Sequence, residues 1–190
     1  IDECHILMLC GGFSAGDEPD GSGKFIANVL NNKDIADAIH ALLDRGGLIL
    51  GICNGFQALV KSGLLPYGRL GMVTKESPTL FRNDINRHIS QIVTTRVGTT
   101  NSPWLSGFAV GDLHTIAVSH GEGKFVVNEE FAKELFANGQ VAFQYVDPID
   151  EEVTMESPYN PNGSYYAIEG IVSRNGQILG KMGHTERYEE

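Results

Sequence analysis

The chain has 190 residues, of which 42% are hydrophobic and 20% charged, a composition that fits one folded domain and excludes general disorder. Twenty-four acidic residues against fourteen basic ones give a formal net charge of -10. Such a charge repels a phosphate backbone, so we expect no nucleic-acid partner. No apolar run approaches the roughly 20 residues of a membrane span, and residues 1–12 lack the features of a signal peptide. We therefore expect no membrane association.

The cysteines indicate a reducing compartment. Cys4, Cys10 and Cys53 cannot all pair, and no Cys-x-x-Cys occurs. Without a secretory signal, free thiols and a cytoplasmic location are expected. His184 and Glu186 form the His-x-Glu half of a zinc-deaminase motif, but the Pro-Cys-x-x-Cys half is absent, so we expect no metal site.

The first half of the chain predicts alternating strands and helices. The predicted elements are a strand over 6–9, a loop over 13–23, a helix over 24–30, a helix from a cap at Asp34 to a stop at Gly46, a strand over 48–52 and a helix over 54–62 that Gly63 ends. Strands and helices that alternate with short loops are typical of a parallel sheet with crossover helices.

The second half predicts mostly strands. They lie at 89–97, 141–146, 165–172 and 177–182, with a hairpin turn at Asn175-Gly176 and a short helix from Asn128 to Gly139. We interpret residues 147–163 as a surface excursion rather than a domain boundary. The whole pattern favours one α/β domain with antiparallel strands added to a parallel core.

Residues 51–55, Gly-Ile-Cys-Asn-Gly, lie between a predicted strand and a predicted helix. This is the spacing of a nucleophile elbow, in which a sharp turn presents the nucleophile and small neighbours prevent clashes. The helix N-terminus would favour the Cys53 thiolate, and the Asn54 amide would form half of an oxyanion hole. The alternative is a buried structural cysteine.

A thiol nucleophile needs a base and a group that orients it. His184 follows an apolar strand and precedes Glu186 by two residues, so both side chains can face the elbow. His120 also ends an apolar strand and is the rival base, and a polar surface residue is the alternative for His184. The residues alone do not choose between the two histidines.

Two further positions are candidates for the same site. The loop Gly11-Gly12-Phe13-Ser14 after the first strand could supply the second oxyanion donor, or its glycines could simply make a tight turn. Gln57 lies one helical turn after Cys53 and could bind a polar substrate, although exposed glutamines on helices usually have no such role.

Five motifs occur together in one order: GGFSAGD at 11–17, GICNGFQ at 51–57, SHGEG at 119–123, NPNGS at 160–164 and GHTER at 183–187. With them the chain resembles the class I (triad) glutamine amidotransferase domain of phosphoribosylformylglycinamidine synthase. The resemblance implies a flavodoxin-like, three-layer fold whose mixed central sheet is mostly parallel with antiparallel additions.

The resemblance also implies an activity, which is the hydrolysis of glutamine to glutamate and ammonia through a thioester. The implied residues are Cys53 as nucleophile, His184 as base, Glu186 as its orienting acid, Gly12 and Asn54 as oxyanion hole, and Gln57, His120, Gly121 and Glu122 in the glutamine pocket. The ammonia would pass to an ATP-dependent synthetase, fused or separate, for purine biosynthesis. ATP and Mg²⁺ would bind to that synthetase, and no cofactor to residues 1–190.

The chain departs from the family pattern at two places. Many relatives have Pro-His-Pro-Glu-Arg where residues 183–187 read Gly-His-Thr-Glu-Arg. A complete domain also begins with a strand and a helix before the strand at 6–9, so we expect 1–190 to be the C-terminal part of a longer chain, with exposed sheet edge and apolar surface. Alternative functions are a Cys-dependent α/β hydrolase of another class, whose residue order differs, and an inactive structural or regulatory glutaminase-like fragment.

Overall fold

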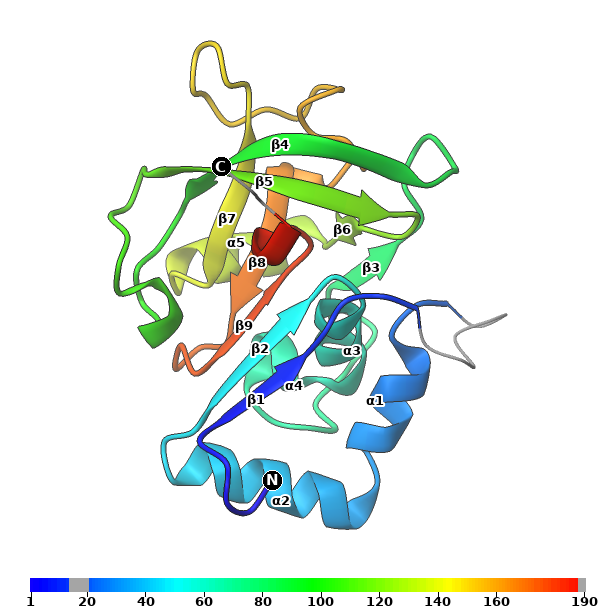
Figure 1. Ribbon diagram of the computed structural model, residues 1–190, viewed down its shortest axis with the longest axis vertical. Helices are drawn as coiled ribbons and strands as arrows, with labels where there is room; N and C mark the ends of the chain where they lie inside the picture. Colours follow the sequence, from blue (N-terminus) through cyan, green and yellow to red (C-terminus); the bar gives the residue numbers. More distant parts are fainter. Residues whose placement is uncertain (14–20, 188–190) are drawn as a thin grey trace.

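The computed structural model describes residues 1–13 and 21–187 (Figure 1). In this part of the chain the strands are β1 (Ile6–Leu9), β2 (Leu48–Ile52), β3 (Thr79–Phe81), β4 (Ile89–Val97), β5 (Leu113–His120), β6 (Lys124–Val126), β7 (Val141–Val146), β8 (Ile168–Val172) and β9 (Ile178–Lys181). The helices are α1 (Lys24–Leu30), α2 (Lys33–Asp44), α3 (Asn54–Ser62), α4 (Leu64–Tyr67) and α5 (Glu129–Ala137), with the 3-10 turns η1 (Pro103–Leu105), η2 (Tyr165–Ala167) and η3 (Thr185–Arg187). None of these helices combines the length and apolar character needed to cross a bilayer.

The predicted mixed α/β architecture is confirmed. Seven of the described strands form one sheet in the order β1-β2-β9-β8-β7-β4-β5, while β3 and β6 form a separate pair. β9, the last strand, pairs in parallel with β2 and antiparallel with β8, so it joins the two halves of the chain.

The expectation of a mostly parallel sheet is wrong for the described strands. Only the β1–β2 and β2–β9 pairs are parallel, and the other four pairs of the large sheet are antiparallel. Crossover helices, which parallel pairing requires, occur in the first half of the chain. In the second half a tight turn such as that at Gly176, with φ 75°, returns the chain directly and makes the pair antiparallel.

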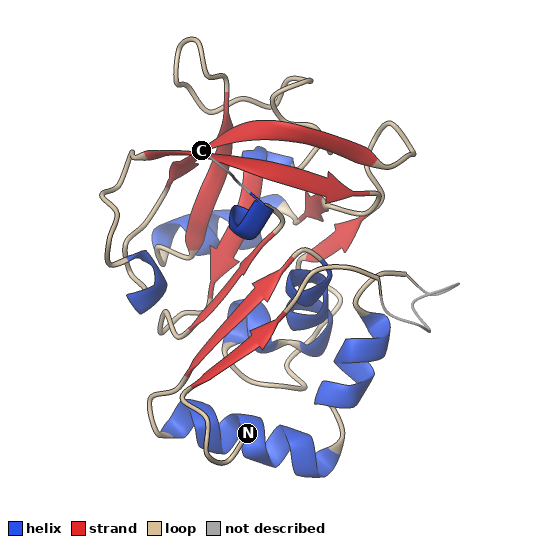
Figure 2. Ribbon diagram, viewed as in Figure 1, coloured by secondary structure: helices blue, strands red, loops and turns tan. Residues whose placement is uncertain are grey.

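The helices gather on one face of the sheet (Figure 2). Buried residues of all five α-helices belong to one core cluster with those of β2, β8 and β9, for example Leu42, Phe56 and Leu135. On the opposite face the segment around η1 packs Leu105 against Phe143. Within the described residues, the second helix layer of the expected three-layer fold is therefore replaced by this segment.

β1 forms one edge of the described sheet. Ile6 and Met8 on this strand are 54% and 48% exposed, although strands of a parallel sheet are normally covered on both faces. A further strand and helix, expected from the resemblance, would cover this surface, and that expectation stays a prediction.

Most local predictions hold, and two are wrong. The cap of α2 is Asn32, whose side chain accepts a hydrogen bond from the Asp34 amide at 3.1 Å, so Asp34 lies in the first turn instead. The strand predicted from residue 165 begins at Ile168, because Tyr166 has a left-handed φ of 55° that no strand adopts.

Candidate active site

The nucleophile elbow is present between β2 and α3. Cys53 has φ 52° and ψ -107°, a conformation that non-glycine residues rarely adopt. A Cβ atom at Gly51 would lie 2.5 Å from Leu59 Cδ1, and one at Gly55 would overlap the Leu9 carbonyl oxygen. The two glycines therefore make the sharp turn possible, as the spacing predicts.

Two backbone amides are aimed at the sulfur of Cys53. Burial raises the pKa of the Cys53 thiol to about 11, while hydrogen bonds from the amides of Asn54 and Gly12 and the positive charge of Arg187 act in the opposite direction. The thiol lies 3.8 Å from the Ser119 carbonyl oxygen, to which it donates. The protonated thiol therefore interacts with both amides that the resemblance assigns to an oxyanion hole.

His184 is held in place by its neighbours on both sides. Its Nδ1 lies 2.6 Å from Glu186 Oε1, and its backbone amide donates to the Ala117 carbonyl oxygen on β5 at 2.7 Å. Since the carboxylate accepts the Nδ1 proton, Nε2 is left as a free acceptor, and this buried atom has no hydrogen-bond partner among the described residues. Burial alone would raise the pKa of Glu186, but the hydrogen bond from His184 and further interactions lower it below the ordinary value. Glu186 is therefore ionised and orients the imidazole.

His184 and Cys53 approach each other across Gly11, which the sequence analysis did not single out as a packing residue. A Cβ atom there would lie 2.6 Å from His184 Cε1 and 3.3 Å from Cys53 Cβ. Gly11 lies two residues after the end of β1. The last residue of β1, Leu9, pairs with Gly51 of β2, so Gly11 lies close to the elbow. The sequence signal for this contact is the Gly11-Gly12 pair. The side chain that requires glycine at position 11 is His184, which comes from the far end of the chain.

His120, the rival base, is engaged elsewhere. Its Nε2 lies 3.1 Å from the Nδ2 of Asn162, which donates to it. Burial, with smaller contributions from His88 and His184, lowers the pKa of His120 to about 3. The imidazole is therefore neutral, and the atom that would have to accept a proton already holds a hydrogen bond.

Gln57, Gly121 and Glu122 enclose the cavity at the elbow. The Gln57 side-chain amide donates to the Glu122 carbonyl oxygen, and the Glu122 carboxylate accepts the amide of Ser22 at 2.9 Å. The Gly121 carbonyl accepts the amide of Asn83 at 3.0 Å. The carboxylate of Glu122 is thus bound to the segment that leads into α1, while its backbone carbonyl is bound to Gln57 of α3.

The sequence-predicted residues meet in one small cavity of about 70 Å³. Eight of the nine line it: Gly12, Cys53, Asn54, Gln57, His120, Gly121, Glu122 and His184. Glu186 reaches it through His184. Ser119, His88 and Arg187 also line the cavity. Ser119 and Arg187 belong to the motifs at 119–123 and 183–187, whereas no pattern in the sequence marks His88.

A buried asparagine, Asn162, holds His120 in the wall of this cavity. The Nδ2 of Asn162 lies 2.9 Å from the Gly123 carbonyl oxygen and 3.1 Å from the Tyr145 hydroxyl, besides His120. Its Oδ1 accepts from the Ser164 hydroxyl at 2.7 Å. This asparagine belongs to the NPNGS motif at 160–164, but the burial of a loop asparagine cannot be derived from composition.

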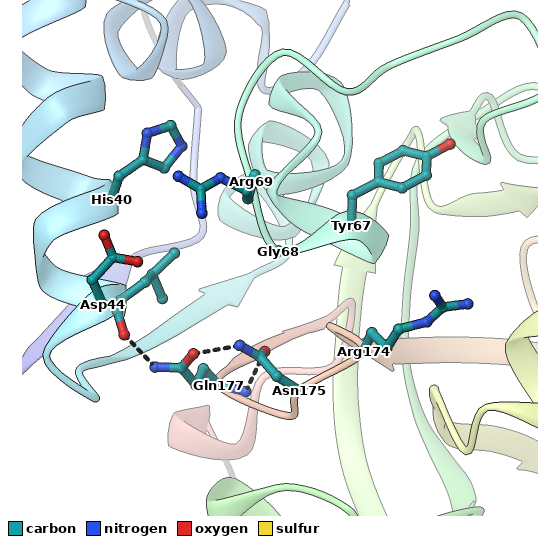
Figure 3. A pocket seen from close by; sticks show the side chains of 9 residues that line it. His40, Asp44, Tyr67, Gly68, Arg69, Arg174, Asn175 and Gln177 are labelled. Carbon is teal, nitrogen blue, oxygen red and sulfur yellow. Dashed lines mark hydrogen bonds between the residues drawn. The ribbon is translucent and has the colours of Figure 1, made fainter.

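A larger cavity of about 330 Å³ lies at the other end of β2 and β9 (Figure 3). His40 and Arg69 face each other across it, and the Gln177 side chain donates to the carbonyl oxygens of Leu43 and Gly47, at 2.9 Å each. Ligands of α/β sheets bind at the carboxyl ends of the strands, where Cys53 lies, rather than at this end. Within residues 1–13 and 21–187, no three His, Cys, Asp or Glu side chains gather as a metal site would need.

The sequence and the fold both match known proteins. A family model described as a CobB/CobQ-like glutamine amidotransferase domain matches residues 1–190. A curated protein of Gloeobacter violaceus, named phosphoribosylformylglycinamidine synthase subunit PurQ, is 34% identical over 187 residues, which are 98% of this chain and 72% of that protein. The subunit of the same name from Acaryochloris marina is 37% identical, with 98% and 72% covered. A solved structure described as PurLQS from Thermotoga maritima matches with a TM-score of 0.73 and 30% identity, over 100% of this chain and 73% of that one.

Proposed function

Since the chain belongs to the family of CobB/CobQ-like glutamine amidotransferases, we propose that it hydrolyses glutamine and supplies the ammonia to a phosphoribosylformylglycinamidine synthetase in purine biosynthesis. One observation carries the proposal for the chemistry. The buried Nε2 of His184, unpartnered among the described residues, belongs to an imidazole that Glu186 orients and that meets Cys53 across Gly11. A thiol, an imidazole with a free nitrogen, and a carboxylate that orients the imidazole are the three parts of a cysteine-nucleophile triad.

In the first step the Cys53 sulfur attacks the side-chain carbonyl carbon of glutamine. With a pKa of about 11 the thiol is protonated at rest, so its proton moves to His184 Nε2 as the carbon–sulfur bond forms. The oxygen that gains negative charge takes the hydrogen bonds from the amides of Gly12 and Asn54, which point to the sulfur in the resting protein. The carbon–nitrogen bond then breaks, and His184 gives the proton to the departing ammonia.

In the second step water attacks the γ-glutamyl thioester. His184 accepts a proton from the water and returns it to the Cys53 sulfur when the carbon–sulfur bond breaks, which releases glutamate. Gln57 and the strand end at His120, Gly121 and Glu122 form the wall that receives the glutamine side chain. The Arg187 guanidinium beside the cavity matches the negative charge of an amino-acid substrate.

The partner follows from the relatives, whose names describe a subunit of phosphoribosylformylglycinamidine synthase and a PurLQS assembly. We propose that the synthetase binds ATP and Mg²⁺, that residues 1–190 bind no cofactor, and that the protein acts in the cytoplasm. Ammonia is uncharged and needs only a short protected path, so the elbow end of the sheet would face the synthetase.

The test is Cys53→Ala in the natural full-length protein with its synthetase. We expect glutamate release and glutamine-dependent synthesis to disappear, while synthesis from free ammonia continues. Cys4→Ala, which changes a thiol remote from the elbow, serves as the matched control and should keep both activities. Unchanged glutamine hydrolysis in the Cys53 variant would refute the assignment.

A diazo-ketone analogue of glutamine separates the alternatives. Selective labelling of Cys53 requires an assembled pocket, so an inactive structural fragment would not be labelled. Hydrolysis of simple esters but not of glutamine would instead favour an α/β hydrolase of another class.

A further inference from the structure

Two buried ionisable side chains lie beside the base without lining the cavity. Glu169 on β8 is 1% exposed and Lys181 on β9 is 5% exposed. We propose that they are positioning residues, which fix the residues on either side of His184 and so set the rate of glutamine hydrolysis rather than the binding of glutamine. This inference rests on the proposed function.

Glu169 holds the residue that precedes the base. Its Oε1 accepts the amide of Gly183 at 2.5 Å. A Cβ atom at residue 183 would overlap Ile116 Cδ1 and lie 3.0 Å from Glu169 Oε1, so glycine fits here without any shift of these two side chains. A glycine has no side chain with which to fix its own backbone, so the carboxylate supplies the restraint.

Lys181 holds the residue that follows the base. Its Nζ donates to the Thr185 hydroxyl at 2.6 Å and lies 5.3 Å from the centre of the Phe143 ring. His114 Nε2 is 3.4 Å from the same hydroxyl. Thr185 itself is exposed, so its side chain is fixed by this contact rather than by packing.

Burying these two ionisable groups costs free energy of solvation. Burial raises the pKa of Glu169, against the effects of Lys181 and two backbone amides, and lowers the pKa of Lys181, against those of Glu169 and Glu186. The second carboxylate oxygen of Glu169 has no hydrogen-bond partner among the described residues. A buried charge costs free energy unless it is paired and hydrogen-bonded, so fold stability alone does not account for these two side chains.

The geometry assigns the two contacts to the chemical step. Glu169 holds the backbone amide of Gly183 and Lys181 holds the side-chain hydroxyl of Thr185, the residues on either side of His184, and neither side chain is among those that line the cavity. A displacement of the base by about 1 Å costs on the order of 10²-fold in rate. Loss of either contact is therefore expected to lower kcat while KM for glutamine stays unchanged.

Thr185→Val is the first test, because it removes the hydroxyl at an exposed position without changing the size of the side chain. In the full-length protein with its synthetase, we expect kcat for glutamine to fall about tenfold, KM to stay unchanged and synthesis from free ammonia to be unaffected. Thr185→Ser should restore kcat. The matched control is Thr115→Val, an exposed threonine on β5, which should behave as the natural protein.

Lys181→Met and Glu169→Met extend the test. Each of the changes Lys181→Met and Thr185→Val removes the same hydrogen bond, the one between the two side chains. The double variant should therefore have the same kcat as either single variant. Glu169→Gln keeps an acceptor oxygen for Gly183 and should retain kcat, whereas Glu169→Met should lose it.

Natural kcat in Thr185→Val, or a loss confined to KM, would overturn the inference. Cys53→Ala, run beside it, keeps the two ideas apart. If Cys53→Ala is inactive with glutamine and Thr185→Val is not impaired, the glutaminase assignment stands and only the positioning role fails.

Discussion

Gly11→Ala tests the geometry of the site at the point where its two reacting side chains meet. Gly11 does not have a left-handed φ, so alanine fits its backbone and the effect of the change is purely steric. The added methyl group would lie 2.6 Å from His184 Cε1, where ordinary contact begins at 3.4 Å. The imidazole has little freedom to retreat, because Glu186 holds Nδ1 and β5 holds its backbone amide.

The methyl group therefore has to move the ring by about 1 Å, and a shift of that size costs on the order of 10²-fold in kcat, or about 2.7 kcal/mol in the activation barrier. Glutamate release by the full-length protein with its synthetase measures the effect. Gly107→Ala is the matched control, since a Cβ atom there meets nothing within 4 Å. Gly11→Ala with natural kcat would show that His184 does not work from the position that it occupies beside Gly11.

Three further predictions follow from the same geometry. Glu186→Gln should lower kcat at least tenfold with little change in KM, since the imidazole loses its ionised partner; equal kcat values would contradict the orienting role. His120 stays neutral in the folded protein down to pH about 3, while the unfolded chain binds its proton below about 6.5. Stability should therefore fall as pH drops through that window, and urea unfolding of His120→Gln should show a weaker pH dependence. Asn162→Ala removes the donor to the acceptor nitrogen of His120 and the nearer of two donors to the Gly123 carbonyl. It should lower the free energy of unfolding by about 1–3 kcal/mol, and an unchanged urea midpoint would contradict the buried network.

The nucleophile was accessible to sequence reasoning because its geometry is local. Cys53 lies within a five-residue pattern, and the strand, the turn and the small neighbours all come from adjacent positions. The short loops of the first half likewise determine where its strands and helices begin and end. The cap of α2 shows the limit, since Asn32 and Asp34 are both good capping residues and only the backbone angles at Asn32 decide between them.

The choice of base depended on contacts between distant segments. His120 and His184 both end apolar strands, and only the position of Asn162 on one of them and Glu186 on the other separates them. The same holds for the sheet. β9 lies between β2 and β8 and pairs in parallel with the first and antiparallel with the second, and no periodicity in either half encodes that order. The packing role of Gly11 was out of reach for this reason too.

The hydrogen bond from the His184 amide to Ala117 fastens the base to β5, which lies at the opposite edge of the large sheet from β1. The nucleophile, in contrast, lies on the turn between β2 and α3, which contacts β9 through the hydrogen bond from the Cys53 amide to the Lys181 carbonyl oxygen at 2.8 Å. A molecule in which β5 had loosened while β9 stayed in place would therefore keep its elbow and its sulfur but lose a support of its proton acceptor. Turnover should disappear earlier in denaturant than the helix signal of the first half, which makes glutamine hydrolysis a local gauge of order in the C-terminal strands.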